Sequence, residues 1–192
     1  MSRAATSTGA RQLNDAEREA VRTARLVAYH TCPYYASGLF SLIPVATPGL
    51  GTFAVDRFWR LYMDPALLVG SDAWSPTEAG AVLLHEMGHL LRVHADRATT
   101  LPQPYHHNAW NLAGDAEINA DLLDAGVPLP EGVVTPQAFG CLPHDVAENY
   151  YAHLLATHPP QQGDPSGQPG DSGSGQGDGS PGGAPQRGGS QS

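Results

Sequence analysis

The sequence contains little cysteine, few basic residues and no lysine. Only Cys32 and Cys141 occur, too few for a disulfide framework or a zinc site of paired cysteines, so we expect two free thiols. All 10 basic side chains are Arg, against 19 acidic residues, which gives a formal net charge of −9. This charge argues against nucleic acid or an anionic membrane as a partner, because both require a clustered basic surface.

Long apolar runs are also missing. Residues 1–20 lack the apolar core of a signal peptide, and no later run approaches the roughly 18 apolar residues needed to span a bilayer. These absences predict a soluble cytoplasmic protein.

Composition divides the chain into three segments. From His158 onward Gly, Pro, Ser and Gln dominate, and no aliphatic or aromatic side chain larger than Ala or Pro occurs. Such a segment cannot offset the entropy of ordering it. We therefore predict a flexible N-terminus over residues 1–13, one domain over 14–158 and a disordered tail over 159–192.

Capping signals and apolar spacing predict a mostly helical domain with a small sheet. Helices are expected over residues 15–29, 76–95, 109–126 and 144–158, with a shorter helical piece over 34–42. The β-branched and aromatic segments 43–47 and 51–64 are separated by "PGLG", a turn signal, and indicate a hairpin. The expected class is α+β with a small antiparallel sheet.

Three titratable residues, His85, Glu86 and His89, lie in the apolar stretch "AVLLHEMGHLLRVH". Residues four apart share one helix face, so the two histidines can offer nitrogens to one tetrahedral metal. Glu86, offset by about 100°, can reach a metal-bound water as a general base. This is the H-E-x-x-H signature of zinc hydrolases. Core histidines satisfied by ordinary hydrogen bonds are the alternative, but burying all three groups is costly without a metal.

The other histidines give weaker signals. His94 lies about 180° from His85 if the helix continues, so we expect a structural role for it. His106, His107, His144 and His153 fall in loops or on amphipathic surfaces and are also taken as structural.

The third ligand is expected in "NLAGDAEINADLL", residues 111–123. On a helical wheel Asp115 and Asn119 lie in the middle of the apolar face, close to Leu112, Ile118, Leu122 and Leu123. Glu117, Asp121 and Asp124 lie opposite and are expected to face water. A buried carboxylate requires a partner, and a metal bound by the histidines provides one.

The order of these two motifs resembles the metallopeptidase domain often found N-terminal to von Willebrand type A-like domains in bacterial proteins. In that family an H-E-x-x-H helix is followed by a helix with an A-D-x-x-I-N-like motif. The resemblance covers most of residues 14–157, with Gly114 in place of the common Ala, and rests on His85, Glu86, His89, Asp115, Ile118 and Asn119.

Together the residues and the resemblance imply a zincin-like α+β domain that hydrolyses peptide bonds. One Zn²⁺ is expected on His85, His89 and Asp115, with Glu86 as the general base. A strand from the region 52–64 is expected to line the cleft and pair with an extended peptide. Tyr150 or Tyr151 is a candidate for stabilising the oxyanion, although a core or surface aromatic role is favoured for each. The alternative is a non-catalytic, zinc-stabilised interaction module working with a partner ATPase or a von Willebrand type A-like protein.

Overall fold

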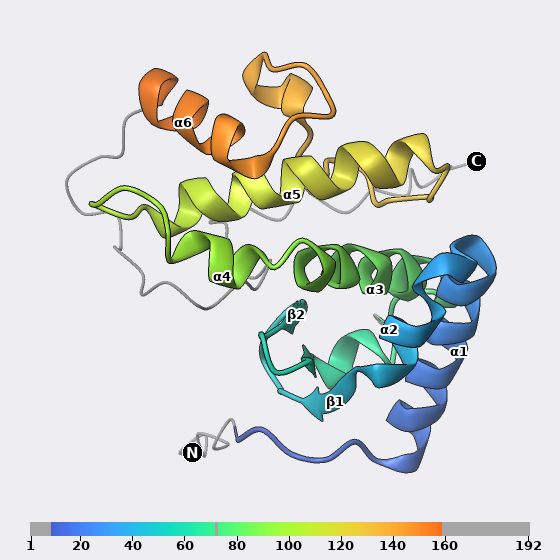
Figure 1. Cartoon of the computed structure of the whole chain (residues 1–192). Helices are drawn as coiled ribbons and strands as arrows, with labels where there is room; N and C mark the ends of the chain where they lie inside the picture. Colours follow the sequence, from blue (N-terminus) through green and yellow to red (C-terminus); the bar gives the residue numbers. More distant parts are fainter. Residues whose placement is uncertain (1–8, 72, 159–192) are drawn as a thin grey trace, which may run out of the picture.

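A computed structural model describes residues 9–71 and 73–158 as a mostly helical fold with one small sheet. This confirms the predicted α+β class. Helix α3 lies in the middle, with the sheet on one side and α5 and α6 on the other (Figure 1). The order of elements is α1 (Asp15–Thr31), η1 (Pro33–Tyr35), α2 (Ala36–Ser41), β1 (Ile43–Ala46), β2 (Phe53–Val55), β3 (Arg60–Met63), η2 (Pro65–Leu67), α3 (Pro76–Leu91), α4 (His94–Ala98), α5 (His107–Asp124), η3 (Pro136–Phe139) and α6 (Ala147–Thr157).

Helices α1 and α3 begin where their capping signals place them. The Asn14 side chain accepts a hydrogen bond from the Glu17 backbone, and the Glu17 carboxylate accepts one from the Asn14 backbone. Ser75 and Glu78 form the same reciprocal pair at the start of α3. Each pair satisfies backbone N–H groups that the first helical turn leaves without partners.

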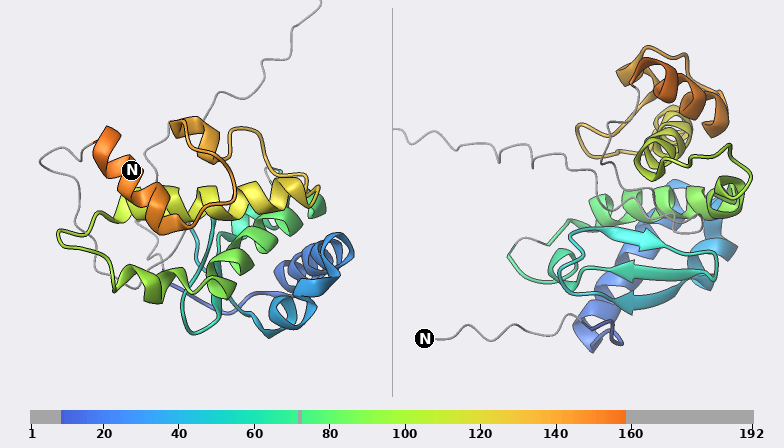
Figure 2. Two further views of the ribbon diagram at one scale, coloured as in Figure 1. Left: turned by 45° about the horizontal axis from the view of Figure 1, so that its top comes forward. Right: turned by 90° about the vertical axis from the view of Figure 1, so that its left-hand side faces the viewer.

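The sheet differs from the predicted antiparallel hairpin. Its strand order is β1-β3-β2, with β1 parallel and β2 antiparallel to β3, so the sheet is mixed. The hairpin joins β2 to β3 within the segment expected to be one long strand. The Asp56 side chain causes this turn by accepting hydrogen bonds from the backbone N–H groups of Phe58 and Arg60. In the order β1-β3-β2 the strand β2 lies at one edge of the sheet, and it packs against α3 (Figure 2).

Helix α3 ends at Leu91, four residues before the predicted end at Ala95. Val93 adopts a left-handed backbone conformation with φ 49°, and α4 starts at His94 in a new direction. The continuing helix assumed for His94 is therefore wrong. No Gly or Pro marks this break in the sequence, which is why the helical pattern hid it.

Two hydrophobic cores lie on either side of the α3–α5 contact. The first joins α1, α2, the sheet and α3, and includes Ile118 from α5. The second joins α4, α5 and α6 around Trp110 and Tyr150. Helix α5 therefore buries two faces. Close approach of α3 to α5 depends on Gly88, because a Cβ there would lie 2.7 Å from the side chain of Ile118.

The double burial of α5 corrects its predicted orientation. Leu112 and Leu123, expected to point inward, are 38% and 45% exposed. Glu117, expected to face water, has a side chain only 12% exposed, because it points toward α4 and α6. The helix also begins at His107, two residues before the predicted start at residue 109, with His106 at the N-cap position.

The described chain extends slightly beyond the predicted domain start. The backbones of Arg11 and Ala46 exchange two hydrogen bonds, and Leu13 is buried, although residues 11–13 were assigned to a flexible terminus. The predicted disordered tail, 159–192, lies outside the described residues. Across 9–71 and 73–158, no helix is both long and apolar enough to cross a membrane.

Candidate metal centre

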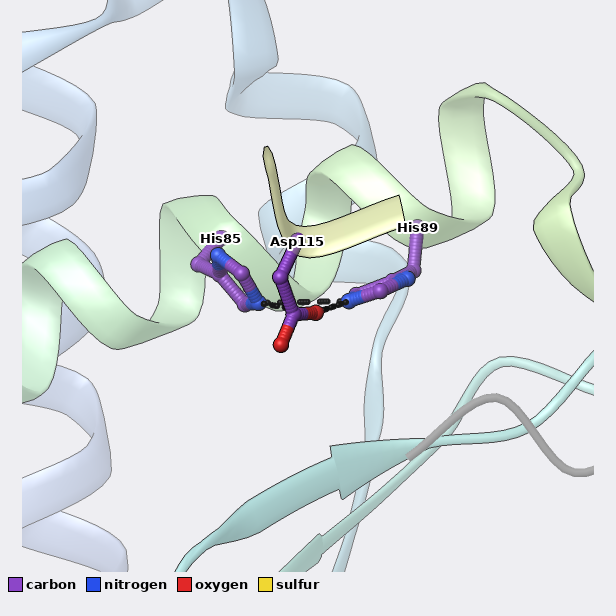
Figure 3. A group of neighbouring side chains, drawn as sticks. All are labelled: His85, His89 and Asp115. Atoms are coloured by element: carbon purple, nitrogen blue, oxygen red, sulfur yellow. Dashed lines mark hydrogen bonds and ion pairs between the residues drawn. The ribbon is translucent and has the colours of Figure 1, made fainter. Parts of the chain in front are cut away.

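Helices α3 and α5 bring three side chains with metal-binding chemistry together. His85 and His89 project from successive turns of α3, and Asp115 reaches them from α5 (Figure 3). The two histidine Nε2 atoms are 3.2 Å apart. Asp115 Oδ1 lies 3.4 Å from His85 Nε2 and 3.1 Å from His89 Nε2. The carboxylate chosen from the helical wheel is thus the one that meets the histidines.

The separations of these donor atoms suit one tetrahedral metal ion. Bonds of about 2.0–2.1 Å at tetrahedral angles place neighbouring nitrogen and oxygen ligands about 3.3 Å apart. The three observed separations, 3.1, 3.2 and 3.4 Å, lie close to this value. Two imidazoles and one carboxylate also form a donor set used by hydrolytic zinc enzymes, in which a fourth position stays open.

Without a metal, the two histidines of the cluster differ in pKa. Burial lowers the pKa of His85, but Asp115, Glu86 and Asn119 outweigh burial and raise it to about 9. Burial dominates at His89 and lowers its pKa to about 4. The two rings together hold the pKa of Asp115 well below its usual range, despite the burial of that carboxylate. Near neutral pH an ionised carboxylate and one protonated histidine therefore occupy the cluster, and a divalent cation can replace that proton.

His85 is oriented by a neutral amide. Its Nδ1 lies 2.8 Å from Asn119 Oδ1, and Asn119 Nδ2 donates to the Val134 carbonyl at 2.8 Å. Because that carbonyl only accepts, the amide nitrogen must face it and the amide oxygen must face His85. His85 then carries a hydrogen on Nδ1, and Nε2 is the nitrogen at which a metal would replace the second proton. Asn119 thus lies where it can act as the hydrogen-bond partner of a metal-binding histidine.

His89 is oriented by another histidine. Its Nδ1 lies 3.0 Å from His94 Nδ1, and His94 Nε2 lies 3.3 Å from Glu117 Oε2. The His94 ring is 1% exposed and packs edge-on against Trp110. The structural role expected for His94 thus includes direct contact with the histidine cluster, which the break at Val93 makes possible.

Glu117 is held by positive charge on the side away from the cluster. Its carboxylate accepts hydrogen bonds from Arg97 at 3.2 Å and from the Ala147 backbone at 2.7 Å, and it pairs with Arg92 at 3.3 Å. Burial raises the pKa of Glu117, but hydrogen bonds from His94 and Arg97 outweigh burial and lower it to about 2. Glu117 is therefore an ionised anchor between α4, α5 and α6.

Glu86 and the two candidate tyrosines lie in different settings. Glu86 is fully buried in α3, and its charge contributes to the raised pKa of His85. Tyr150 donates to the Leu142 carbonyl and accepts from the Asp145 backbone, at 2.8 and 3.0 Å.

The hydroxyl of Tyr151 accepts from the His106 backbone at 3.0 Å. Both tyrosines belong to the second core, in line with the aromatic packing role favoured from the sequence. The two cysteines are free, as expected.

Comparison with known proteins agrees with the resemblance drawn from the H-E-x-x-H motif and the motif around Asp115 that follows it. The sequence model of one family, described as "Putative metallopeptidase domain", matches residues 16–192. No curated protein and no solved structure matches the chain.

Proposed function

This chain belongs to that family of metallopeptidase domains, and from this premise we propose that it is a zinc-dependent peptidase. The observation that carries the proposal is the triangle of donor atoms with sides of 3.1, 3.2 and 3.4 Å. His85, His89 and Asp115 would hold one Zn²⁺. When bound, zinc supplies a Lewis acid that polarises a peptide carbonyl and lowers the pKa of a water molecule.

Glu86 is the proposed general base. It follows His85 in α3, so its side chain is offset by about 100° from a ligand position and lies beside the metal site. A carboxylate there can take the proton of the attacking water and later deliver it to the leaving amine. Its full burial keeps bulk water from competing for that proton.

Exposure supports access to the site from one side. The side chains of Asp115 and His85 are 17% and 11% exposed, whereas that of His89 is 3% exposed. Water and a substrate carbonyl would approach over Asp115 and His85, with His89 at the back.

The free edge of β2 supports binding of an extended peptide. Bonds from Asp64 N to Thr52 O and from Asp56 N to Arg60 O fix the alternation of the β2–β3 ladder. By that alternation Phe53 and Val55 turn their backbone N–H and C=O groups away from β3. A peptide adding to this edge would pair with these groups and run beside α3, with side-chain pockets giving specificity.

Metal analysis combined with proteome-wide cleavage profiling tests the proposal. Glu86→Gln should keep about one zinc per chain and lose cleavage, because Gln preserves the shape and removes the base. Glu131→Gln, on an exposed loop, is the matched control and should retain both zinc and cleavage.

Two outcomes would overturn the peptidase proposal. A Glu86→Gln variant that cleaves at the rate of the unaltered protein would remove Glu86 from the mechanism. An unaltered protein that binds zinc and cleaves nothing would be a zinc-stabilised interaction module. In that case a partner ATPase or von Willebrand type A-like protein becomes the object to search for.

A further inference from the structure

We propose that His94 is a positioning residue that fixes His89 as a metal ligand, with Glu117 as its charged anchor. This inference rests on the proposed zinc site and adds a role for two residues that do not touch the metal. Three independent features of the structure carry it: hydrogen-bond directions, a left-handed residue and a missing Cβ.

With a cation bound by His89 Nε2 and Asp115, the hydrogen-bond directions between neutral imidazole rings allow one arrangement of the protons. Two histidine Nδ1 atoms 3.0 Å apart require one donor and one acceptor. If His94 donated, its own Nε2 would present a lone pair to the Glu117 carboxylate 3.3 Å away, which is repulsive. His94 therefore accepts from His89 Nδ1–H and donates through Nε2–H to Glu117. In that arrangement the His89 Nε2 lone pair faces the Asp115 carboxylate at 3.1 Å, and a divalent cation bound by both atoms would turn this contact from repulsive to attractive.

The backbone is strained at Val93, the residue before His94. Val93 holds φ 49° immediately before α4, a conformation that is unfavourable for a β-branched side chain. Its side chain is 52% exposed, so packing of Val93 itself does not explain the strain. The turn brings the His94 ring beneath the end of α3, where His89 meets it.

Helix α5 has no side chain at Gly114, which leaves room for the His94 ring. A Cβ on Gly114 would lie 2.9 Å from His94 Nδ1 and 3.1 Å from His94 Cε1. An alanine at this position would therefore crowd the atom that accepts from His89. The residue next to the ligand Asp115 thus lacks a side chain at the point where the supporting histidine requires space.

Glu117 ends the series of contacts that runs from His89 through His94, and it holds the Nε2 side of the His94 ring. Arg97 donates to it and to Glu148 of α6, and the backbone of Ala147, the first residue of α6, donates to it at 2.7 Å. Glu117 is thus bonded to residues of α4 and α6 in addition to His94. A carboxylate held in this way keeps the His94 Nε2–H in place, and so keeps the His94 Nδ1 lone pair toward His89.

A near-isosteric pair of variants tests the role. His94→Asn keeps an acceptor at the position of Nδ1, and His94→Leu has similar size without an acceptor. Zinc affinity, measured by competition with a chromophoric chelator, should fall about 10- to 100-fold in His94→Leu and stay close to that of the unaltered protein in His94→Asn. Equal affinity in His94→Leu, or an equal loss in both variants, would overturn the proposal.

A second measurement uses the unaltered, zinc-loaded protein and does not depend on a variant folding. Two-bond ¹H–¹⁵N correlation of labelled histidines reports which ring nitrogen carries each proton, and the signal lost in His94→Asn assigns His94. We expect His94 to be protonated on Nε2 alone. A proton on its Nδ1 would overturn the proposal, whereas an unaltered protein that binds no zinc would instead contradict the proposed function.

Discussion

The two histidines of H-E-x-x-H occupy successive turns of one helix but have different surroundings. Behind His85 stands a neutral amide, Asn119, bonded to a backbone carbonyl. Behind His89 stands His94 and then a carboxylate, Glu117, clamped by arginines. The two proposed ligands thus have unlike partners, since each partner only has to accept the Nδ1–H and leave Nε2 for a metal.

The largest expected effect separates the ligand Asp115 from the anchor Glu117. Asp115→Ala should lose zinc during dialysis against a mild chelator, because one of three protein ligands is gone. Glu117→Ala should retain more zinc than Asp115→Ala, since all three donor atoms remain. The measurement is zinc per chain for the two variants side by side. An empty Glu117→Ala site beside a full Asp115→Ala site would reverse the assignment.

The next largest effect is expected on the free energy of unfolding and its pH dependence at Glu117, the charged residue behind His94. The pKa of Glu117 is lowered from 4.5 to about 2, so its stabilisation is fully present above pH 4.5 and is lost as pH falls through 2. In zinc-free protein, Glu117→Gln should lower the free energy of unfolding at pH 7 by roughly 2–3 kcal/mol, discounted for partial exposure.

Urea unfolding from pH 7 to 2 measures this difference, and it should shrink toward zero at the acid end. Glu131→Gln, on an exposed loop, provides the control for the removal of one carboxylate charge. A Glu117→Gln difference that stays constant across the range would mean that the carboxylate charge does not stabilise the fold.

A smaller effect on zinc affinity is expected at Asn119, the neutral amide that contacts His85. Asn119→Leu removes the acceptor of the His85 Nδ1–H at similar volume and should weaken zinc binding about tenfold, at the low end for second partners of metal ligands. His94→Leu should lie nearer the upper end of that range, because the side chain of His89 is 3% exposed against 11% for His85, so water is less able to replace the lost acceptor. Chelator competition on both variants measures the contrast, and a greater loss in Asn119→Leu would invert it.

The smallest effect is expected at Tyr150, which lies in the second core. Tyr150→Phe removes hydrogen bonds to Leu142 and Asp145 and should cost about 1 kcal/mol of stability, with kcat and KM for any cleaved peptide unchanged. A large fall in kcat with unchanged stability would instead make this hydroxyl part of the catalytic site.

Sequence reasoning succeeded where local periodicity decides position. The spacing of His85 and His89 places them on one face of α3, and the wheel placed Asp115 and Asn119 on a shared face of α5. The same wheel was wrong for Glu117, because a single apolar face was assumed while α5 packs between two cores.

Long-range contacts account for the remaining errors. The break at Val93 has no Gly or Pro to mark it, and a left-handed valine is stabilised by contacts that helix propensity does not contain. The parallel pairing of β1 with β3 also depends on residues distant in sequence. The side chain of Asp56 and the missing Cβ of Gly114 were the available local signals for the β2–β3 turn and for the His94 site.

X-ray absorption at the zinc edge of the purified chain tests the central claim most directly, that His85, His89 and Asp115 hold one zinc. We predict about one zinc per chain with two imidazole nitrogens and oxygen ligands at about 2.0–2.1 Å. We also predict that Asp115→Ala cannot be loaded to the same extent. Absence of zinc, or sulfur ligands at about 2.3 Å from the two cysteines, would contradict it.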